Sequence, residues 1–344
     1  MTFGEILSRQ RKAHGWSQER LAEHLGITRQ SLIALEHDRR TPSLALAMAV
    51  AHLFDTSLDA LVKPLEREPA AMGSTRWLGP QPLFPTPVIW AFVAHTVVLV
   101  PTDRLLRPRL PDALWDPRSG RLTTMPSGRD PRHVILMGGC DPFASWLQTF
   151  YETERPGYWL EPVRLSSESA IHAFNEGLLH VAGAHLFDPT TQRYNRISFA
   201  GNAVFRQPYL QWEEGLICHP EASHIKHIAI REPGSEAHNL YRRHQGSGPW
   251  QPDVFYSHQS ILDYVISHPQ WAGVGLGSLA ATAGLCFEPW ALESYDLFLR
   301  EADRTAPWAA RLFTILASGE LRSVFAAMPH ITLSLKAPGT GRAF

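Results

Sequence analysis

The sequence predicts a multidomain protein in which a small all-α head is followed by a small β unit and a larger α/β domain. A helix-turn-helix pattern in residues 7–42 predicts the head. Residues 64–87 are rich in Pro and Gly without a sustained period, which is typical of a linker. Strand-like and helix-like segments alternate through residues 131–335, which predicts a sheet with helices on its faces.

Two short helices form the centre of the head. Ser17 can cap a first helix that reaches Leu25, and Gly26 supplies a tight turn. Thr28 can cap a second helix that reaches Glu36. The apolar residues of this pair have the spacing of one buried stripe: Leu21, Leu25, Ile27, Leu32 and Leu35.

The second of these helices is the candidate DNA reader. Burial of the stripe leaves Arg29, Gln30 and Ile33 on the outward face, where side chains can meet base edges in the major groove. The alternative is a helical protein-interaction domain with the same fold. We expect double-stranded DNA as the partner, because the pattern matches at many positions.

The head extends over residues 1–63. Ser43 can cap a further helix, and Thr56 with Asp59 resembles a capping box for a last short helix that ends near Val62. The head holds eight Lys or Arg residues and seven Asp or Glu residues, so one head should bind DNA only modestly. Two heads on a homodimer would remedy this weakness.

A small β unit is predicted for residues 88–130, between the linker and the α/β domain. The run from Val88 to Val100 is rich in β-branched and aromatic residues, and a turn-rich segment around Asp116–Gly120 suggests a hairpin. We assign no chemistry to this unit. Residues 336–344 are expected to be a tail.

Composition excludes several classes of function. The longest apolar run, Val88–Val100, is interrupted by His95 and is too short to span a bilayer, so we expect no membrane role. The N-terminus is typical of a helix start and not of a signal peptide, which favours a cytoplasmic protein. The known signatures of hydrolases, zinc proteases, phosphate-binding loops and dinucleotide sites are absent, so we expect no enzyme and no catalytic residues.

The sequence predicts neither a disulfide framework nor a metal site. His224 and His227 stand at i, i+3 with His219 upstream, a spacing that can bind metal on a helix. However, no Cys or acidic residue completes the set, and the segment is typical of the entrance to a strand. The three cysteines are scattered singly along the chain: Cys140, Cys218 and Cys286.

The head resembles the phage-repressor helix-turn-helix family (Cro and CI-like, XRE-type). The resemblance is carried by Trp16-Ser17-Gln18, Leu35-Glu36 and Arg40-Thr41-Pro42. It implies that Ser17 and Gln18 touch phosphate, that Arg29 and Gln30 read bases, and that Arg39 or Arg40 lies near the DNA backbone. Ile33 departs from the polar residue usual in the family and suggests contact with a thymine methyl group. The DNA-binding residues expected are Ser17, Gln18, Thr28, Arg29, Gln30, Ile33, Arg39 and Arg40.

Residues 132–335 resemble the two-lobed periplasmic-binding-protein fold of type II, in particular the molybdate-binding-like substrate domain fused to helix-turn-helix heads in bacterial regulators. Five segments carry the resemblance: Gly139-Cys140-Asp141-Pro142, Ser166-Ser167, Gly183 to Asn195, Arg231 to Ser235, and Tyr295-Asp296-Leu297. Glu236-Ala237-His238 departs from the Gly-Thr-Arg that usually follows Gly-Ser in the family. The resemblance implies a small ligand in a cleft between two lobes.

Four expected helix starts follow strands and should meet at this cleft: Asp141-Pro142, Ser166-Ser167, Gly234-Ser235 and Ser257-His258. Free N–H groups at helix starts favour anions, although each Ser could merely cap its helix. Asp141 would repel a bare oxyanion and would suit an amine or hydroxyl group, whereas Arg231 could pair with a ligand acid. The ligand-binding residues expected are Asp141, Ser166, Ser167, His185, Arg231, Gly234, Ser235, Ser257 and His258.

The function expected is that of a one-component transcriptional regulator. A homodimer would bind operator DNA and sense an oxyanion, such as molybdate or tungstate, or a small organic molecule, and it would need no cofactor. The alternative is a DNA-binding protein whose C-terminal domain is a ligand-free dimerisation or partner-binding module.

Overall fold

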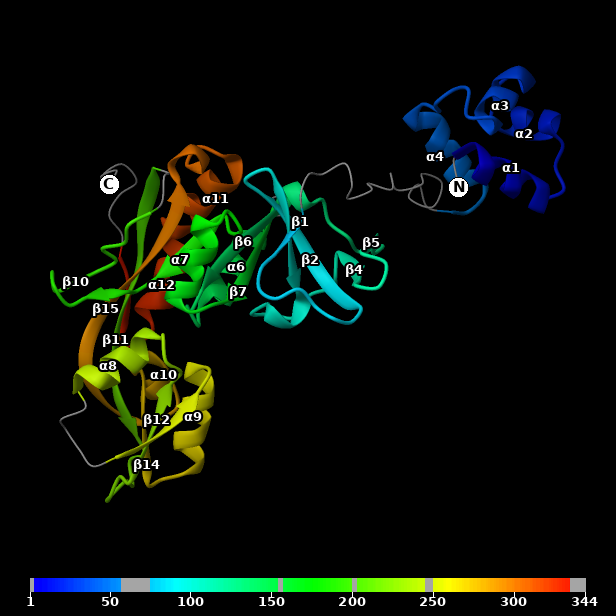
Figure 1. Ribbon diagram of the computed structural model, residues 1–344. Coiled ribbons are helices and arrows are strands. Elements are labelled where there is room, and N and C mark those ends of the chain that lie inside the picture. Colours follow the sequence, from blue (N-terminus) through cyan, green and yellow to red (C-terminus); the bar gives the residue numbers. More distant parts are fainter. Residues whose placement is uncertain (1–2, 57–74, 154–156, 200–202, 245–249, 335–344) are drawn as a thin grey trace. The chain divides into compact units, whose positions relative to one another are not determined.

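The computed structural model describes residues 3–56, 75–153, 157–199, 203–244 and 250–334 (Figure 1). The chain divides into two compact units, Met1–Met72 and Gly73–Phe344. Each unit has its own hydrophobic core and is described by itself.

The N-terminal unit is helical, as the sequence predicts. Ser17 accepts a hydrogen bond from the backbone N–H of Arg20 at 3.1 Å, and Thr28 accepts one from Ser31 at 3.2 Å, so both residues cap the helices that follow them. Gly26 has a φ of +64° and forms the turn between these helices. The helices are α1 (Phe3–Ala13), α2 (Gln18–His24), α3 (Arg29–Glu36) and α4 (Leu44–Leu53).

The predicted stripe forms the core of this unit. Leu21, Leu32 and Leu35 are buried, and Leu25 and Ile27 pack against them at partial exposure. The last short helix expected between Thr56 and Val62 lies outside the described residues, as does the expected tail at residues 336–344.

A buried ion pair ties α1 to the end of α3. Arg11 donates from Nε to Glu36 Oε1 at 2.6 Å and from Nη2 to Glu36 Oε2 at 3.1 Å. Gln18, at the start of α2, donates to Glu36 Oε2 at 2.9 Å. Because the Glu36 side chain is only 5% exposed, these partners offset the cost of burying its charge and fix three helices together.

The C-terminal unit begins with a five-stranded sheet in the order β1-β3-β2-β4-β5. The linker predicted for residues 64–87 lies outside the described residues as far as residue 74. The rest of it contains β1, which pairs in parallel with β3, with Thr75 opposite Val97, and the start of β2. A strand of three residues shows no period that could be recognised in the sequence. The strands are β1 (Thr75–Trp77), β2 (Thr86–Val93), β3 (Thr96–Pro101), β4 (Ala113–Asp116) and β5 (Arg121–Thr124).

This small sheet does not stand alone. Ile89 on β2 and Val98 on β3 belong to the same buried cluster as Leu136 and Phe174, which come from the α/β part of the chain. The β unit predicted for residues 88–130 is therefore present but forms one packed body with the domain that follows.

A nine-stranded sheet forms the body of the unit, in the order β13-β12-β14-β11-β15-β8-β6-β7, with β16 paired to β11. Its strands are β6 (Val134–Gly139), β7 (Trp159–Arg164), β8 (Val181–Ala184), β11 (Val204–Cys218), β12 (His227–Arg231), β13 (Gln251–Phe255), β14 (Trp271–Leu276), β15 (Cys286–Arg300) and β16 (Ile331–Leu333). A separate two-stranded ribbon pairs β9 (Phe187–Asp188) with β10 (Arg193–Tyr194).

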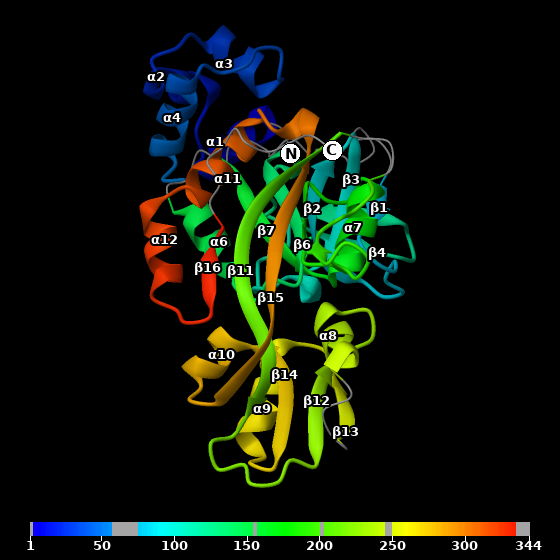
Figure 2. The same cartoon turned by 90° about the vertical axis from the view of Figure 1, so that its left-hand side faces the viewer.

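Helices cover the two ends of this sheet and create two lobes (Figure 2). The first lobe combines β6, β7 and β8 with α6 (Ala144–Glu152), α7 (Ser167–Asn175), α11 (Pro307–Leu316) and α12 (Gly319–Ala326). The second lobe combines β12, β13 and β14 with α8 (Glu236–His244), α9 (His258–Ser267) and α10 (Gly277–Thr282). Short 3₁₀ helices occupy Thr102–Arg104, Pro131–His133 and Glu301–Asp303.

Two long antiparallel strands join the lobes. β11 and β15 are 15 residues each and pair from Val204 opposite Arg300 to Cys218 opposite Cys286. Figure 2 shows them side by side through both lobes. The register shifts between Glu214 and Gly215, where the strands leave the first lobe and β11 begins to pair with β14. The predicted two-lobed α/β domain is therefore confirmed.

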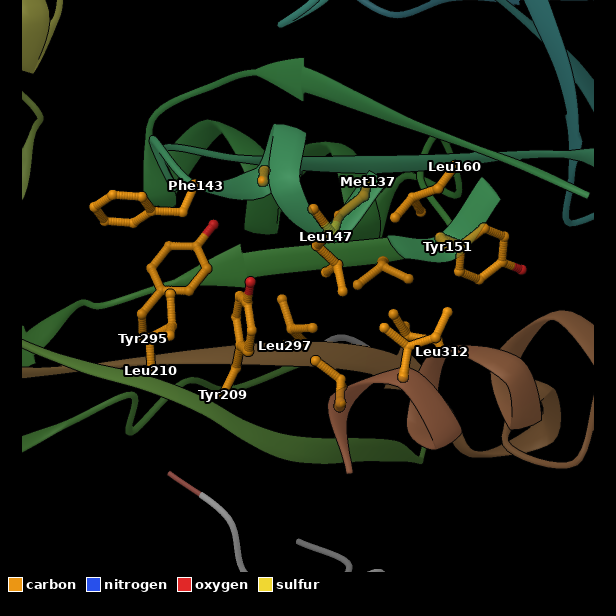
Figure 3. Packing of buried hydrophobic residues seen from close by; sticks show 14 of the residues in the cluster. Met137, Phe143, Leu147, Tyr151, Leu160, Tyr209, Leu210, Tyr295, Leu297 and Leu312 are labelled. Carbon is orange, nitrogen blue, oxygen red and sulfur yellow. The ribbon is translucent and has the colours of Figure 1, made fainter. Parts of the chain in front are cut away.

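The first lobe has a dense core between its sheet and α11 (Figure 3), in which Leu147, Leu297 and Leu312 are fully buried. Tyr295 on β15 packs against two glycines on neighbouring strands, Gly139 and Gly183. A Cβ at either glycine would lie far inside van der Waals contact with the Tyr295 hydroxyl. These glycines let the tyrosine lie across β6 and β8, next to the residues that follow β6.

This packing gives a matched pair of substitutions. At Gly139 the added methyl group of Gly139→Ala meets mainly the Tyr295 hydroxyl, since Cζ is 3.3 Å away. At Gly183 it meets the ring itself, with Cζ at 2.5 Å and Cε1 at 2.7 Å. Each alanine should lower the free energy of unfolding by about 1–3 kcal/mol. Urea unfolding should show that Tyr295→Phe recovers most of the loss for Gly139→Ala and little for Gly183→Ala. Equal recovery at both positions would contradict this packing.

Candidate functional site

The expected DNA-binding residues lie along α2, α3 and the segment after α3. Gln30, Arg39 and Arg40 are exposed, and Ile33 is half-buried. Arg29 is exposed and pairs with Glu19, with Nε 2.6 Å from Oε1. An exposed ion pair of this kind is worth little, so Arg29 can exchange it for a DNA contact.

Three of these residues also have structural contacts. Ser17 and Thr28 cap α2 and α3, and the Gln18 amide donates to Glu36. Each cap uses one backbone N–H at the start of its helix. The other N–H groups there can bind a phosphate oxygen. The structure therefore places the predicted DNA-binding residues on one helix-turn-helix and the segment that follows it.

The C-terminal unit encloses a small cavity between its lobes. Its volume is about 10 Å³, which holds roughly one water molecule. The first lobe contributes Ser166, Ser167 and His185, and the second contributes Arg231, Ser235 and His258. These six predicted ligand residues are brought together, although more than 90 positions separate Ser166 from His258. The other lining residues are Cys140, Glu236 and Ala237.

Three helices begin at this cavity. Ser166 caps α7 by accepting from Ser169 N–H at 3.2 Å, and Ser235 caps α8 by accepting from His238 N–H at 3.2 Å. Ser257 caps α9 in the same way, so that His258, the first residue of α9, lines the cavity. Gly234 precedes α8 with a φ of +90°, a conformation that favours glycine. Three positive helix ends therefore point at one small space.

Helix capping accounts for the hydrogen bonds of most serine hydroxyls at the cavity. The Ser235 hydroxyl donates to the Glu232 carbonyl oxygen at 2.8 Å and accepts from His238 N–H, so both of its roles are filled. Ser167 differs, because its hydroxyl oxygen accepts from the backbone N–H of His185 at 3.2 Å and lies 3.4 Å from Cys140 Sγ. This hydroxyl can donate its hydrogen to a thiolate or accept one from a thiol.

The expectation that Asp141 lines the same cavity is wrong. Asp141 Oδ1 accepts from Phe143 N–H at 2.7 Å, and this turn at the start of α6 folds the short side chain back into the first lobe. There it lines a neighbouring cavity with Leu106 and Tyr295. Its Oδ2 is buried and, in the part of the chain that the structure describes, meets no partner in hydrogen-bond geometry, and burial raises the pKa of Asp141 to about 7.

A buried chain of polar groups passes along the wall of the cavity. Cys140 Sγ lies 3.1 Å from His185 Nε2, and His185 Nδ1 lies 2.6 Å from Glu293 Oε2. Glu293 also accepts from Trp212 Nε1 at 3.0 Å and from the Tyr194 hydroxyl at 3.3 Å. Cys140 follows β6, His185 follows β8, and Glu293 lies on β15, so three neighbouring strands of the first lobe position this chain.

The hydrogen bonds determine which atoms of this buried chain of polar groups carry protons. Glu293 accepts from several donors, so it is the ionised carboxylate and His185 Nδ1 carries a proton. Burial opposes its charge, but the His185 imidazolium and these donors hold the pKa of Glu293 below its usual range. Burial lowers the pKa of His185, but the charges of Cys140 and Glu293 outweigh it and raise that pKa well above its usual value. Burial raises the pKa of the Cys140 thiol, but the His185 charge outweighs it and holds that pKa below its usual range.

A second acid lies beside this chain in a different state. Glu214 on β11 is fully buried, and among the described residues neither of its carboxyl oxygens has a partner in hydrogen-bond geometry. Burial and the Glu293 charge raise the pKa of Glu214 well above its usual range, so it is a neutral acid. His258 Nδ1 lies 3.8 Å away, and burial and the Arg231 charge hold the pKa of His258 well below its usual value.

Among the described parts of the chain, one group of three residues has the spacing of a metal site. Donor atoms of His185, Glu214 and Glu293 all lie within 4.8 Å of one another. The hydrogen bonds of His185 and Glu293 already occupy their facing atoms, and a proton accounts for Glu214.

Arg231 supplies the second cation of the cavity. It is only 7% exposed, and its guanidinium makes a two-point contact with Glu232, with Nε–Oε2 at 2.7 Å and Nη2–Oε1 at 2.8 Å. Burial opposes its charge, but Glu232 raises the pKa of Arg231. Glu236 is likewise paired, with Arg243 at 2.7 Å. The carboxylates near the cavity are therefore matched by cations of the protein itself.

Sequence reasoning missed four residues that shape this site. Cys140 stands among the single cysteines and in the Gly139-Cys140-Asp141-Pro142 segment, but it is not among the expected ligand-binding residues. Glu236 stands out only as a departure from the family, Glu214 and Glu293 carry no motif, and the burial of all three follows from tertiary packing. The weak signal available was an acidic residue within each long apolar strand, where charge is costly unless it is paired.

Two family models match the chain. The helix-turn-helix model matches residues 7–61, and the model of a PBP superfamily domain matches residues 149–317. The first coincides with the helical unit and the second with most of the two-lobed domain.

Curated relatives match the head. An uncharacterized HTH-type transcriptional regulator from Methanothermobacter thermautotrophicus is 50% identical over 46 residues, which are 13% of this chain and 67% of that protein. Another from Methanocaldococcus jannaschii is 41% identical over 49 residues, 14% of this chain and 74% of that protein. A regulatory protein of the HTH type from Thermococcus kodakarensis is 36% identical over 63 residues, 18% of this chain and only 19% of that protein.

Solved structures resemble the C-terminal unit distantly. An ABC-type phosphate transport receptor from Vibrio cholerae has a TM-score of 0.42 and 11% identity, and the match covers 56% of this chain and 97% of that one. The regulatory domain of MetR, a LysR family regulator from N. meningitidis, has a TM-score of 0.44 and 14% identity, with 59% of this chain and 98% of that one covered.

In the described part of the chain, none of the helices is long and apolar enough to cross a membrane.

The buried Asp141 predicts a specific dependence of stability on pH. The pKa of Asp141 in the folded state is about 7, above its unfolded value of 3.8. The contribution of Asp141 to the free energy of unfolding is therefore fully present below pH 3.8 and is lost as the pH rises through 7. Asp141→Asn keeps the acceptor for Phe143 N–H and removes this loss. Relative to the wild type, its free energy of unfolding should therefore rise by roughly 2–4 kcal/mol between pH 4 and pH 8.

Urea unfolding of both proteins at each pH measures this difference. Asp116→Asn is the matched control, because Asp116 is partly exposed, makes the same turn contact with the N–H two residues on, and has a lowered pKa instead. Parallel stability curves for the wild type and Asp141→Asn would contradict the burial of a neutral Asp141.

Proposed function

Because the chain belongs to the helix-turn-helix family of transcriptional regulators, we propose that it is a one-component regulator that binds operator DNA through α3 and senses a small ligand between its lobes. Cytoplasmic action follows from the DNA target. The observation that carries the sensor part is the cavity formed by both lobes, at which α7, α8 and α9 begin.

The chemistry of the cavity favours a ligand with an anionic group. Three positive helix ends meet beside His185 and Arg231, and nearby carboxylates are paired within the protein. The position of Asp141 in a separate cavity removes the repulsion that argued against a bare oxyanion. Molybdate, tungstate, phosphate, sulfate and small carboxylates are therefore the ligand classes to test.

The small volume of the cavity makes ligand entry a conformational event. A space of about 10 Å³ cannot hold even a four-oxygen anion, so the lobes must separate before a ligand enters. Such a movement bends the strands that join the lobes, at the register shift of β11 beside Glu214. Ligand binding would thereby select one angle between the lobes.

We propose a homodimer as the DNA-binding form. The nearly balanced charge of one head supports weak binding to a single half-site, and two heads would read an inverted repeat with centres one or more helical turns apart. For regulation, the ligand must favour one dimer geometry by a coupling of about 1–3 kcal/mol.

One observation favours a second candidate function. The cavity holds little more than one water molecule, and several of its hydroxyls already have partners. A ligand-free dimerisation module attached to a DNA-binding head would show the same features. A shift in melting temperature with an anion separates the two candidates, because a module without a ligand shows none.

The DNA reader is tested by binding selection on randomised duplexes. Arg29→Ala and Gln30→Ala should each relax the preference for a base at particular positions, by about 1–3 kcal/mol, because these side chains face the groove. Arg40→Ala is the matched control and should weaken all sequences alike, as loss of a backbone contact does. Unchanged base preference in the first two variants would refute the assignment of α3 as reader.

The anion site is tested by melting curves of the full chain with each of the anions named above. An anion at 100 times its dissociation constant should stabilise the wild type by about 2.7 kcal/mol. Arg231→Gln should weaken binding by about 1.5–3 kcal/mol, because a hydrogen bond to a charged group is lost. Arg132→Gln, an exposed residue paired with Asp130, is the control and should bind as the wild type does. If no anion shifts the melting temperature, the ligand-free module is the better account.

A further inference from the structure

The wall of the cavity holds three groups in the order that activates a nucleophile. Cys140 Sγ is 3.1 Å from His185 Nε2, and His185 Nδ1 is 2.6 Å from Glu293 Oε2. A nucleophile, a base that contacts it and an acid that orients the base are the three parts of a nucleophilic triad. Neither DNA binding nor anion binding explains why a cysteine completes this set.

We propose that Cys140 is a reactive thiolate that is oxidised by small hydroperoxides such as hydrogen peroxide, with His185 as the proton donor. This chemistry goes beyond the proposed function, because it is a reaction of the sulfur and does not depend on DNA.

The hydrogen bonds around the sulfur support a thiolate. His185 Nδ1–H is committed to Glu293, which leaves Nε2 facing the sulfur. The Ser167 hydroxyl lies 3.4 Å from the sulfur on another side, within reach to donate its hydrogen to a thiolate, while its oxygen accepts from His185 N–H. Two donors, one of them on a charged ring, are what a negatively charged sulfur requires.

The size and lining of the cavity select the reactant. Cys140 is partly exposed and lines a space of about 10 Å³, which in this conformation admits a molecule near the size of water and excludes larger electrophiles. The start of α7 and, from the second lobe, Arg231 line the same space and stabilise negative charge as it develops on the leaving oxygen. A small neutral peroxide meets these conditions.

The step balances within these groups. The Cys140 thiolate attacks one oxygen of hydrogen peroxide, so that an S–O bond forms and the O–O bond breaks. The sulfur loses two electrons and becomes a sulfenic acid, and the peroxide gains them. The second oxygen leaves as hydroxide, takes the proton from His185 Nε2 and departs as water. The ring is left neutral, still donating from Nδ1 to Glu293.

The three cysteines of the chain provide an internal comparison. Cys286 is exposed, whereas Cys140 and Cys218 are partly buried, and Cys218 stands opposite Cys286 on neighbouring strands. If exposure alone decided reactivity, Cys286 would react first. The triad predicts the opposite order, because thiolate character and a proton donor outweigh access.

The test uses the full chain, reduced and freed of metal with a chelator, treated briefly with less than one equivalent of hydrogen peroxide, and then unfolded in urea with dimedone, so that the label reaches every sulfenic acid. Peptide mass spectrometry then gives the rate of sulfenic acid labelling at each cysteine. We expect Cys140 to be labelled at least about tenfold faster than Cys286, as the ratio of thiolate to thiol reactivity requires. Labelling of Cys286 first, or of all three cysteines at equal rates, would overturn the proposal.

A pair of variants then tests the role of His185. His185→Gln should slow labelling of Cys140 at least about tenfold, since it removes the charge beside the sulfur and the proton for the leaving oxygen. His172→Gln is the matched control, because His172 is exposed on α7 and pairs with Glu176 away from the cavity. An unchanged rate in a folded His185→Gln protein would refute the role of His185. If that variant fails to fold, the labelling order in the wild type still decides the proposal.

Discussion

The pairing of β11 with β15 is the constraint on which the C-terminal unit depends. Both strands are 15 residues long, and they run as one antiparallel ladder from the first lobe into the second. Each lobe adds its own parallel strands to a different end of this ladder, with β8 joining beside Asp296 to Leu299 and β14 joining beside Glu214 to Cys218. The two lobes therefore cannot move independently, and any change in the angle between them must bend these two strands.

The buried acids lie where the ladder passes between the lobes. Glu293 on β15 and Glu214 on β11 are both fully buried, yet only Glu293 is surrounded by hydrogen-bond donors. One acid is therefore ionised and the other is neutral, as two carboxyl groups in one apolar space require. Separation of the lobes would admit water to Glu214 and lower the cost of its charge. The hinge region, the cavity and the charge state of these acids are thus physically linked.

The sequence predicted the parts of this protein whose signals are local. The caps Ser17, Thr28 and Ser43 and the apolar stripe ending at Leu35 sufficed for the head, because helix ends and period depend on neighbours in the chain. Helix starts at Ser166, Ser235 and Ser257 brought six of the expected residues to one cavity. The direction of the Asp141 side chain could not be predicted, because an Asp at a helix start either points outward or accepts from the backbone of its own turn. Glu214 and Glu293 could not be found, since their burial arises from strands far apart in sequence.

In a ligand-sensing regulator, closure of the lobes around a ligand changes how the head binds DNA. Thermodynamic reciprocity provides the most direct measurement. Operator affinity is titrated with and without the anion that gives the largest melting shift, and the affinity for that anion is titrated with and without operator DNA. The account predicts that both affinities change by the same factor, at least about fivefold. If both affinities stay unchanged, the cavity and the head are uncoupled and the account of a ligand-sensing regulator is wrong.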